Sequence, residues 1–193
     1  MIFHWSRLGL PSTAQTTLAR AAQEAISGLP DSQPAAPQIG TSRTSGEGTM
    51  PEKIITNKAL CYVVREGRLL VFRHTDFSYE EVGIQVPGGS VRPGEDPAGA
   101  ALREAREETG LTGFAVVRKL GEIEYDISPL RFEIQRRHVF ELALHGATPE
   151  RWASQEDHDG EQEPTRFECF WIPLRAAHVL QSGQGALVGR LFD

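Results

Sequence analysis

Short apolar runs separated by turn residues mark the chain as strand-rich from about residue 54 onward. Residues 60–64 and 69–72 are apolar and flank Arg65-Glu66-Gly67, so they predict a β-hairpin with a tight turn. Residues 84–86 are a further short candidate strand. Longer extended segments are expected at 114–117, 121–127, 132–144 and 167–172, and Ser128-Pro129 is expected to turn the chain between the second and the third.

Two segments carry helical signals. Asp96-Pro97 is a typical helix start and Gly110 a typical helix end. Between them, five residues at helical spacing form the stripe expected to pack inward: Ala98, Ala101, Leu102, Ala105 and Thr109. Residues 174–192 place Leu and Val at helical spacing and predict a second, terminal helix. Strands around one strong helix, followed by a terminal helix, predict a mixed α/β fold.

The first 53 residues differ from the rest in composition. Residues 27–53 are rich in Pro, Ser, Thr, Gly and Gln, which bury too little apolar surface to order a segment, while residues 18–26 have the spacing of a short amphipathic helix. We therefore expect a flexible or partly helical extension over 1–53 and one domain over 54–193. Met50 leaves a second interpretation open, in which residues 1–49 lie upstream of the start; an organelle transit segment is another.

Composition narrows the function classes. The chain has 193 residues and a formal charge of -6, and no apolar run approaches the ~20 residues of a membrane-spanning helix, so we expect a cytoplasmic protein with no membrane contact. We expect no long nucleic acid as a partner, because phosphate-backbone binding rests on clustered Lys and Arg. Arg136-Arg137-His138 is the main candidate for a local basic groove, although on a strand it would equally suit an exposed edge. Cys61 and Cys169 lie in apolar runs and are expected to be reduced and structural.

Three carboxylates share one face of the predicted helix. Helical periodicity places Glu104, Glu107 and Glu108 together, where like charges destabilise the helix unless a cation joins them. Oxygen ligands without nearby Cys or His suit Mg²⁺ or Mn²⁺. Gly88 and Gly89 just upstream allow the backbone close to a ligand. Taken alone, however, the run Arg-Glu-Ala-Arg-Glu-Glu is equally typical of a solvated helix face.

The wider spacing resembles the signature of the Nudix hydrolase family. The signature's fixed positions are all filled, by Gly89, Glu95, Arg103, Glu104, Ala105, Glu107, Glu108, Gly110 and Leu111. The resemblance implies an α/β/α sandwich with a mixed sheet, and a metal-dependent hydrolase cleaving a diphosphate bond in a nucleoside diphosphate linked to another group. It further implies that Mg²⁺ or Mn²⁺ is held by Glu107, Glu108 and the Gly88 carbonyl. Glu104 would bind metal or activate water, and Arg103 would orient Glu104.

Other positions are candidates of lower rank. Nudix enzymes often recruit a carboxylate from a distant loop, and residues 145–165 are an acidic stretch with no strand signal. Its candidates are Glu156, Asp157, Asp159, Glu161 and Glu163, of which Glu163 is preferred because it precedes a strand. Four residues before the glycine loop suit a nucleotide: Arg73, His74, Phe77 and Tyr79. Glu95 has either a helix-start or a metal role, and Phe170 and Trp171 are expected to be core and rim residues of a strand.

Two alternatives to this activity stay open at the level of sequence. One is a non-catalytic module that senses a nucleotide, against which the intact set of glutamates argues. The other is a hydrolase of RNA caps or of non-nucleotide diphosphates. Because Nudix domains often pair, a homodimer is a further expectation, although no interface is evident in the sequence.

Overall fold

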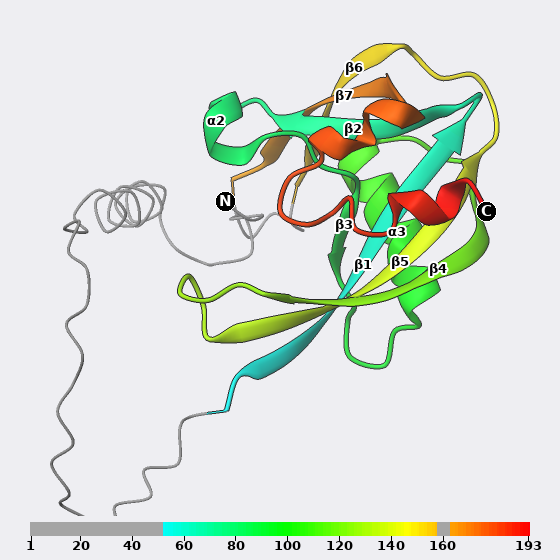
Figure 1. Ribbon diagram of the computed structural model, residues 1–193. Coiled ribbons are helices and arrows are strands. Elements are labelled where there is room, and N and C mark those ends of the chain that lie inside the picture. The colour runs from blue at the N-terminus through cyan, green and yellow to red at the C-terminus, as the bar shows by residue number, and fades with distance from the viewer. Residues whose placement is uncertain (1–51, 158–162) are drawn as a thin grey trace, which may run out of the picture. The chain divides into compact units, whose positions relative to one another are not determined.

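The computed structural model describes residues 52–157 and 163–193, so nearly all of the extension predicted for residues 1–53 lies outside the described part (Figure 1). These described residues form seven strands, two α-helices and two 3₁₀ helices. In chain order they are β1 (Ile54–Arg65), β2 (Arg68–His74), α2 (Tyr79–Val82), β3 (Gly88–Ser90), α3 (Pro97–Thr109), β4 (Phe114–Asp126), β5 (Glu133–Leu144), β6 (Arg151–Glu156), β7 (Thr165–Pro173), η3 (Leu174–Val179) and η4 (Val188–Leu191). No helix of the described residues is long and apolar enough to cross a membrane.

β1 is the strand that joins the two halves of the sheet. The strand order is β4-β5-β1-β2-β7-β6, with β3 paired to β1 beside that path. β1 pairs with β5 in parallel and with β2 and β3 in antiparallel orientation. The sheet is therefore mixed, as predicted, and its long central strand carries the glycine strand β3 along one stretch of its length.

The β1–β2 hairpin is confirmed. Its turn residues Glu66 and Gly67 have φ of 51° and 70°, the pair of positive values that the twist of a two-residue hairpin favours. The segments predicted at 114–117 and 121–127 are one strand, β4, which pairs with β5 through two register shifts. Residues 84–86 form isolated bridges, from Ile84 to Leu180 and from Gln85 to Phe72, rather than a strand.

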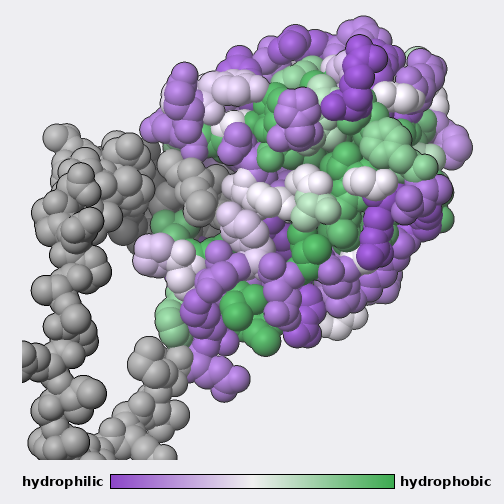
Figure 2. Space-filling view, viewed as in Figure 1, coloured by the Kyte–Doolittle hydropathy of each residue, from purple (hydrophilic) through white to green (hydrophobic). Residues whose placement is uncertain are grey.

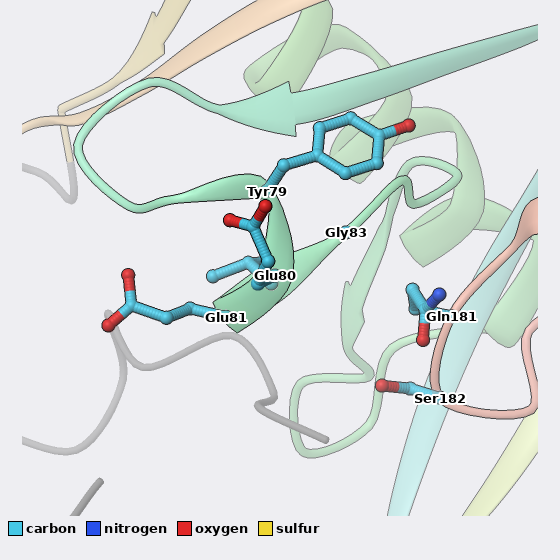
Figure 3. Close-up of a pocket in the computed structure, with 7 residues that line it drawn as sticks. Tyr79, Glu80, Glu81, Gly83, Gln181 and Ser182 are labelled. Atoms are coloured by element: carbon cyan, nitrogen blue, oxygen red, sulfur yellow. The ribbon is translucent and has the colours of Figure 1, made fainter. Parts of the chain in front are cut away.

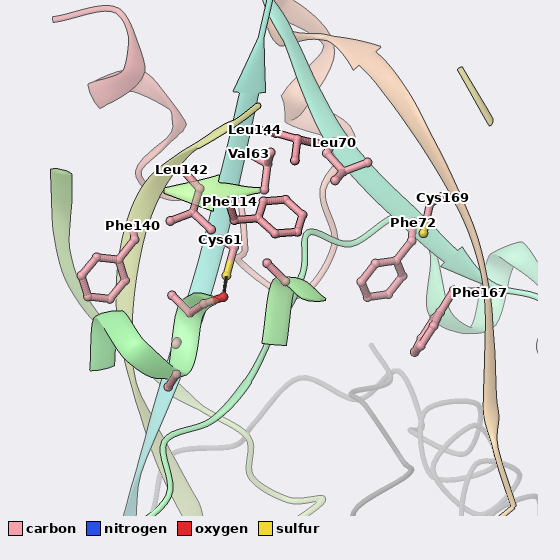
Figure 4. Packing of buried hydrophobic residues seen from close by; sticks show 14 of the residues in the cluster. Cys61, Val63, Leu70, Phe72, Phe114, Phe140, Leu142, Leu144, Phe167 and Cys169 are labelled. Carbon is pink, nitrogen blue, oxygen red and sulfur yellow. Dashed lines mark hydrogen bonds between the residues drawn. The ribbon is translucent and has the colours of Figure 1, made fainter. Parts of the chain in front are cut away.

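Two apolar clusters lie on opposite sides of the sheet. The first packs beneath α3 and contains Cys61, Leu142 and Phe167 together with Ala101 and Ala105 of the helix (Figure 4). The second contains Tyr62, Leu69 and Val139, and Leu174, Leu187 and Leu191 of the C-terminal segment pack against it. The space-filling view shows hydrophilic side chains around the rim and hydrophobic ones over the middle of one face (Figure 2). The sandwich arrangement is confirmed.

The second helical layer differs from the prediction. Residues 174–192 form η3 and η4 joined by turns instead of one terminal helix. Ser182 and Gly183 have φ of 59° and 69°, a left-handed conformation that a continuous helix excludes. The Gln184 side chain in this turn segment accepts a hydrogen bond from the Val86 N–H at 2.8 Å, and the Gln181 N–H donates to the Ile84 carbonyl oxygen, so the segment is bonded to residues 84–86.

The stretch at 145–165 also differs, because it contains strand β6, which pairs antiparallel with β7 along its whole length. Exposure alternates along β6: Arg151, Ala153 and Gln155 are exposed, and Glu156 is buried. The sequence did not predict this strand because only one face of an edge strand is covered, so most of its residues are polar.

Candidate active site

The helix that carries the site, α3, is fixed at both ends by its own sequence. The Asp96 carboxylate accepts hydrogen bonds from the N–H groups of Ala98 and Gly99, both at 3.1 Å. At the other end Gly110 adopts the left-handed conformation with φ of 68°, and its N–H bonds to the Arg106 carbonyl. Both predicted helix boundaries are confirmed.

The stripe of α3 predicted to pack inward does so, but the buried face of the helix is wider than the stripe. Ala101, Ala105 and Thr109 are buried, Ala98 and Leu102 are half-buried and pack against the core, and Ala100 joins the core as well. Glu104 and Glu108 are both fully buried. Helical periodicity had placed these carboxylates beside the packing face, whereas the close approach of the glycine strand encloses them between helix and sheet.

The glycines of β3 make this close approach feasible. A Cβ atom on Gly89 would lie 2.3 Å from the carboxylate of Glu104, and one on Gly88 would lie 2.5 Å from the Ala59 carbonyl oxygen. Neither distance is compatible with a side chain. The Gly88 N–H donates to Glu108 Oε2 at 2.7 Å, which ties the loop directly to the helix.

Arg103 organises the acidic side chains around it. Its Nη1 donates to Glu104 Oε1 at 2.8 Å and to Glu107 Oε2 at 2.9 Å. Its Nε donates to Glu95 Oε1 at 2.8 Å, and Nη2 donates to the Ser90 carbonyl oxygen at 2.8 Å. The hydrogen bond from Arg103 is the main cause that lowers the pKa of Glu95 to about 2, and the same bond raises the pKa of Arg103. One guanidinium thus fixes loop, helix start and two glutamates relative to each other.

Glu104 and Glu107 meet a third carboxylate from a distant element. Glu104, Glu107 and Glu156 each offer a carboxylate oxygen, and the three oxygens lie within 4.8 Å of one another. Glu156 ends β6 and is 6% exposed. We call Glu104, Glu107 and Glu156 the carboxylate cluster.

Glu163, the carboxylate preferred from the sequence, is exposed and lies outside the carboxylate cluster, so its role at the site stays a prediction. Asp157 is also exposed and accepts a hydrogen bond from Gln155 at 2.7 Å. Asp159 and Glu161 lie outside the described residues. The signal that could have identified Glu156 is the alternation Trp152, Ser154, Glu156, which sets these residues on one face of a strand.

The donor chemistry of the carboxylate cluster fits Mg²⁺ or Mn²⁺. All of its ligand atoms are carboxylate oxygens, which hard divalent cations prefer, and the described part of the chain places no Cys or His in the group. The Gly89 position adds to the fit, because an alanine there would displace a cluster carboxylate. Glu108 is outside the cluster, so its predicted part as a metal ligand, like that of the Gly88 carbonyl, stays a prediction.

The four candidate substrate residues lie at the end of β2 and around α2. Arg73 donates to Glu168 Oε2 at 2.7 Å, on the neighbouring strand β7. His74 is buried and packs edge-on against Phe72, Phe77 and Phe167, so it belongs to an aromatic cluster. Tyr79 is 52% exposed. The substrate roles of Arg73, Phe77 and Tyr79 stay predictions.

Tyr79 lines a pocket of about 220 Å³ between α2 and the C-terminal segment (Figure 3). Glu80 and Glu81 contribute from the same helix, and Gln181 and Ser182 from the other side. The lining offers hydrogen-bond acceptors, an amide and an aromatic ring, a set that suits donor groups of a ligand better than its phosphates.

The predicted basic groove is absent from its expected place. Arg137 is 1% exposed, lies 4.0 Å from the Tyr125 ring centroid and donates to the Ser182 carbonyl oxygen at 2.6 Å. His138 is also buried, and Arg136 pairs with Glu124 at 3.1 Å. The segment is not an exposed edge, because β5 lies between β1 and β4, and its three basic side chains are buried or paired. Phe170 and Trp171 lie on β7 as expected, half-buried and buried.

A glycine loop and a helix that gather carboxylate oxygens on an α/β domain are typical of enzymes that act on phosphates. Comparison with known proteins agrees: residues 56–188 match the model of the NUDIX domain. An RNA pyrophosphohydrolase of Brucella abortus (strain 2308) is 30% identical over 136 residues, which cover 63% of this chain and 71% of that protein. An ADP-ribose pyrophosphatase of Bacillus subtilis (strain 168) is 32% identical over 82 residues, 42% of each chain.

Solved structures agree in fold. The MutT protein from Methanosarcina mazei Go1 superposes with a TM-score of 0.55 at 19% identity, over 74% of this chain and 96% of that one. A UDP-X diphosphatase superposes with a TM-score of 0.51 at 16% identity, over 76% of this chain and 66% of that one. The chain belongs to the Nudix hydrolase family. It is a hydrolase that acts on diphosphate bonds.

Proposed function

We propose that the chain is a divalent-metal-dependent hydrolase that cleaves a diphosphate bond in a nucleoside diphosphate linked to another group. The observation that carries the metal dependence is the carboxylate cluster, whose three oxygens lie within 4.8 Å of one another. Carboxylates this close repel one another, and a divalent cation between them removes that cost. When bound, Mg²⁺ or Mn²⁺ neutralises the negative charge that develops on the diphosphate.

The side chains divide the remaining work. Glu107 and Glu156 hold the cation, and Glu104, which Arg103 orients, holds it or accepts a proton from the attacking water. Arg103 keeps these carboxylates in place through its bonds to Glu104, Glu107 and Glu95. Glu108 binds the Gly88 N–H and so keeps the loop closed on the helix.

Two substrate classes compete, and each has its support. A nucleoside diphosphate derivative suits the pocket lined by Tyr79, Gln181 and Ser182, where an aromatic ring and polar side chains can contact an uncharged moiety. An RNA 5′ end is supported by the activity named for the Brucella relatives. The formal charge of -6 and the burial of Arg137 favour the small substrate, because long RNA needs exposed cations.

Product chromatography over a substrate panel tests this proposal. The panel holds ADP-ribose, other nucleoside diphosphate derivatives, a non-nucleotide diphosphate and a 5′-triphosphorylated RNA, each with and without Mg²⁺ or Mn²⁺. We expect cleavage of a nucleoside diphosphate derivative that falls at least about a hundredfold in Glu107→Gln. Glu150→Gln is the matched control, since that side chain is 76% exposed and pairs only with Arg68 among its described partners.

Three results would contradict the proposal. Turnover that needs no metal would refute the metal role, and turnover of RNA alone would reassign the substrate class. Binding of a nucleotide without cleavage of any panel member would favour a sensing module.

A further inference from the structure

The edge strand β6 presents one row of side chains to helix α3. β6 ends the strand order and pairs with β7. Side chains alternate along a strand, so Trp152, Ser154 and Glu156 share a face. This face meets α3, since Trp152 packs against the apolar cluster beneath the helix and Glu156 lies in the carboxylate cluster. β6 therefore runs from the C-terminal end of α3 back toward its middle.

Trp152 makes a directional contact at the end of the helix. Its indole Nε1 donates to the Thr109 carbonyl oxygen at 2.8 Å. Thr109 is the last residue of α3, and the last carbonyl groups of a helix receive no hydrogen bond from N–H groups of the same helix. One step along the strand, the Ser154 Oγ lies 3.3 Å from where a Cβ on Gly110 would stand. The strand thus lies close against the helix end at two successive positions of one row.

The third position of that row is Glu156. Pairing with β7 fixes the position of β6 within the sheet. Glu156 reaches the carboxylate cluster only if β6 is also correctly placed along α3, which carries Glu104 and Glu107. The indole bond fixes that relation, because Thr109 belongs to the same rigid helix as Glu104 and Glu107. A shift of β6 along the helix would move Trp152 off Thr109 and Glu156 out of the cluster together.

We propose that Trp152 is a positioning residue that fixes β6 against α3 and thereby places Glu156 in the carboxylate cluster. The inference rests on the proposed metal-dependent function. It adds that the third carboxylate depends on a tryptophan four residues away that binds neither metal nor substrate. Removing the indole N–H should therefore weaken metal binding through Glu156, while substrate recognition stays as it was.

The test is a double-mutant cycle between Trp152→Phe and Glu156→Gln, made in the full chain. The readouts are the Mn²⁺ dissociation constant, from the electron paramagnetic resonance signal of free Mn²⁺, and kcat and KM for the best panel substrate. We expect Trp152→Phe to raise the dissociation constant and lower kcat, each about three- to tenfold, with KM unchanged within about twofold. In the Glu156→Gln background, Trp152→Phe should change either value by less than about twofold.

Trp171→Phe is the matched control. Trp171 is a core tryptophan of the adjacent strand whose Nε1 donates to the Pro149 carbonyl oxygen at 3.2 Å, so it loses the same kind of bond. It should leave the Mn²⁺ dissociation constant unchanged. If Trp152→Phe does not stay folded at the assay temperature, Trp152→Tyr replaces it, since tyrosine also lacks a donor at the Nε1 position.

The inference is overturned if Trp152→Phe has no effect, if its effect persists in Glu156→Gln, or if Trp171→Phe matches it. It is likewise overturned if Glu156→Gln binds Mn²⁺ as the wild type does. Failure of the proposed function looks different, because it would appear as wild-type protein that binds no Mn²⁺, or as unchanged turnover in Glu107→Gln.

Discussion

Alanine in place of Gly89 is expected to disable the site while the domain stays folded. Gly89 lies on β3, and its φ is outside the left-handed range, so alanine meets no backbone strain there. The conflict is steric and local: the new Cβ would stand 2.3 Å from the carbon and both oxygens of the Glu104 carboxylate. Since the Arg103 guanidinium and the burial of Glu104 leave this side chain little room, the carboxylate itself must move.

The required movement sets the size of the effect. Ordinary contact for a Cβ atom begins near 3.4 Å, so the carboxylate must shift by about 1 Å. A displacement of about 1 Å in a catalytic constellation costs on the order of a hundredfold in rate. We therefore expect kcat to fall about a hundredfold, with a clear loss of Mn²⁺ affinity and little change in KM.

Steady-state kinetics, Mn²⁺ binding and thermal unfolding measure these effects separately. Gly99→Ala is the matched control: it lies on α3, has no neighbour within 4 Å of an added Cβ, and should leave activity unchanged. Alanine should also stabilise the helix there by roughly 0.5–1 kcal/mol. If Gly89→Ala kept kcat and Mn²⁺ affinity within about threefold of the wild type, the argument that Glu104 is held in a fixed position would be refuted.

Two further predictions concern titrating groups. The pKa of Glu95 is lowered from its ordinary value of 4.5 to about 2, mainly by its hydrogen bond with Arg103. The ionised Glu95 side chain therefore stabilises the fold fully at pH values above 4.5, and this stabilisation is lost as the pH falls toward 2. The urea-unfolding difference between wild type and Glu95→Gln should thus shrink from pH 6 to pH 3, and a constant difference would contradict it. Burial raises the pKa of Cys61, and that of Cys169 to about 12, so both thiols should resist a disulfide reagent at pH 8 until urea is added. Rapid reaction of either thiol in the folded protein would show that the core is open.

The central helix α3 and the carboxylates that it carries could be predicted from the sequence because their signals are local. Asp96-Pro97 and Gly110 define helix ends through bonds to residues at most four positions away. The spacing of Glu104 and Glu107 places them one turn apart on any helix, and the spacing from Gly89 identified the family. The β1–β2 hairpin could be predicted for the same reason, since the adjacent residues Glu66 and Gly67 form its turn.

Features that depend on contacts between distant segments were predicted incorrectly. β6 lies in an acidic stretch that had no strand signal, and its side chains alternate between two faces only because β7 supplies the hydrogen-bonding partner. The C-terminal segment has helical spacing, yet its Gln181 N–H donates to the Ile84 carbonyl oxygen and its Ser182 carbonyl oxygen accepts from Arg137. Arg136-Arg137-His138 is basic in sequence, but β5 is an interior strand, so its charge is paired or enclosed.

The residues of the site also fall into those predicted from local spacing and those decided by the tertiary structure. Sequence alone assigned the family, the glycine loop, the helix and the carboxylates at positions 104 and 107, because these follow from spacing along one segment. The tertiary structure decided that Glu104 and Glu108 are buried, that Glu156 rather than Glu163 completes the cluster, and that Trp152 lies at the end of α3. Burial and register are set by which segments pack together, and a one-residue shift of an edge strand turns every side chain to the opposite face.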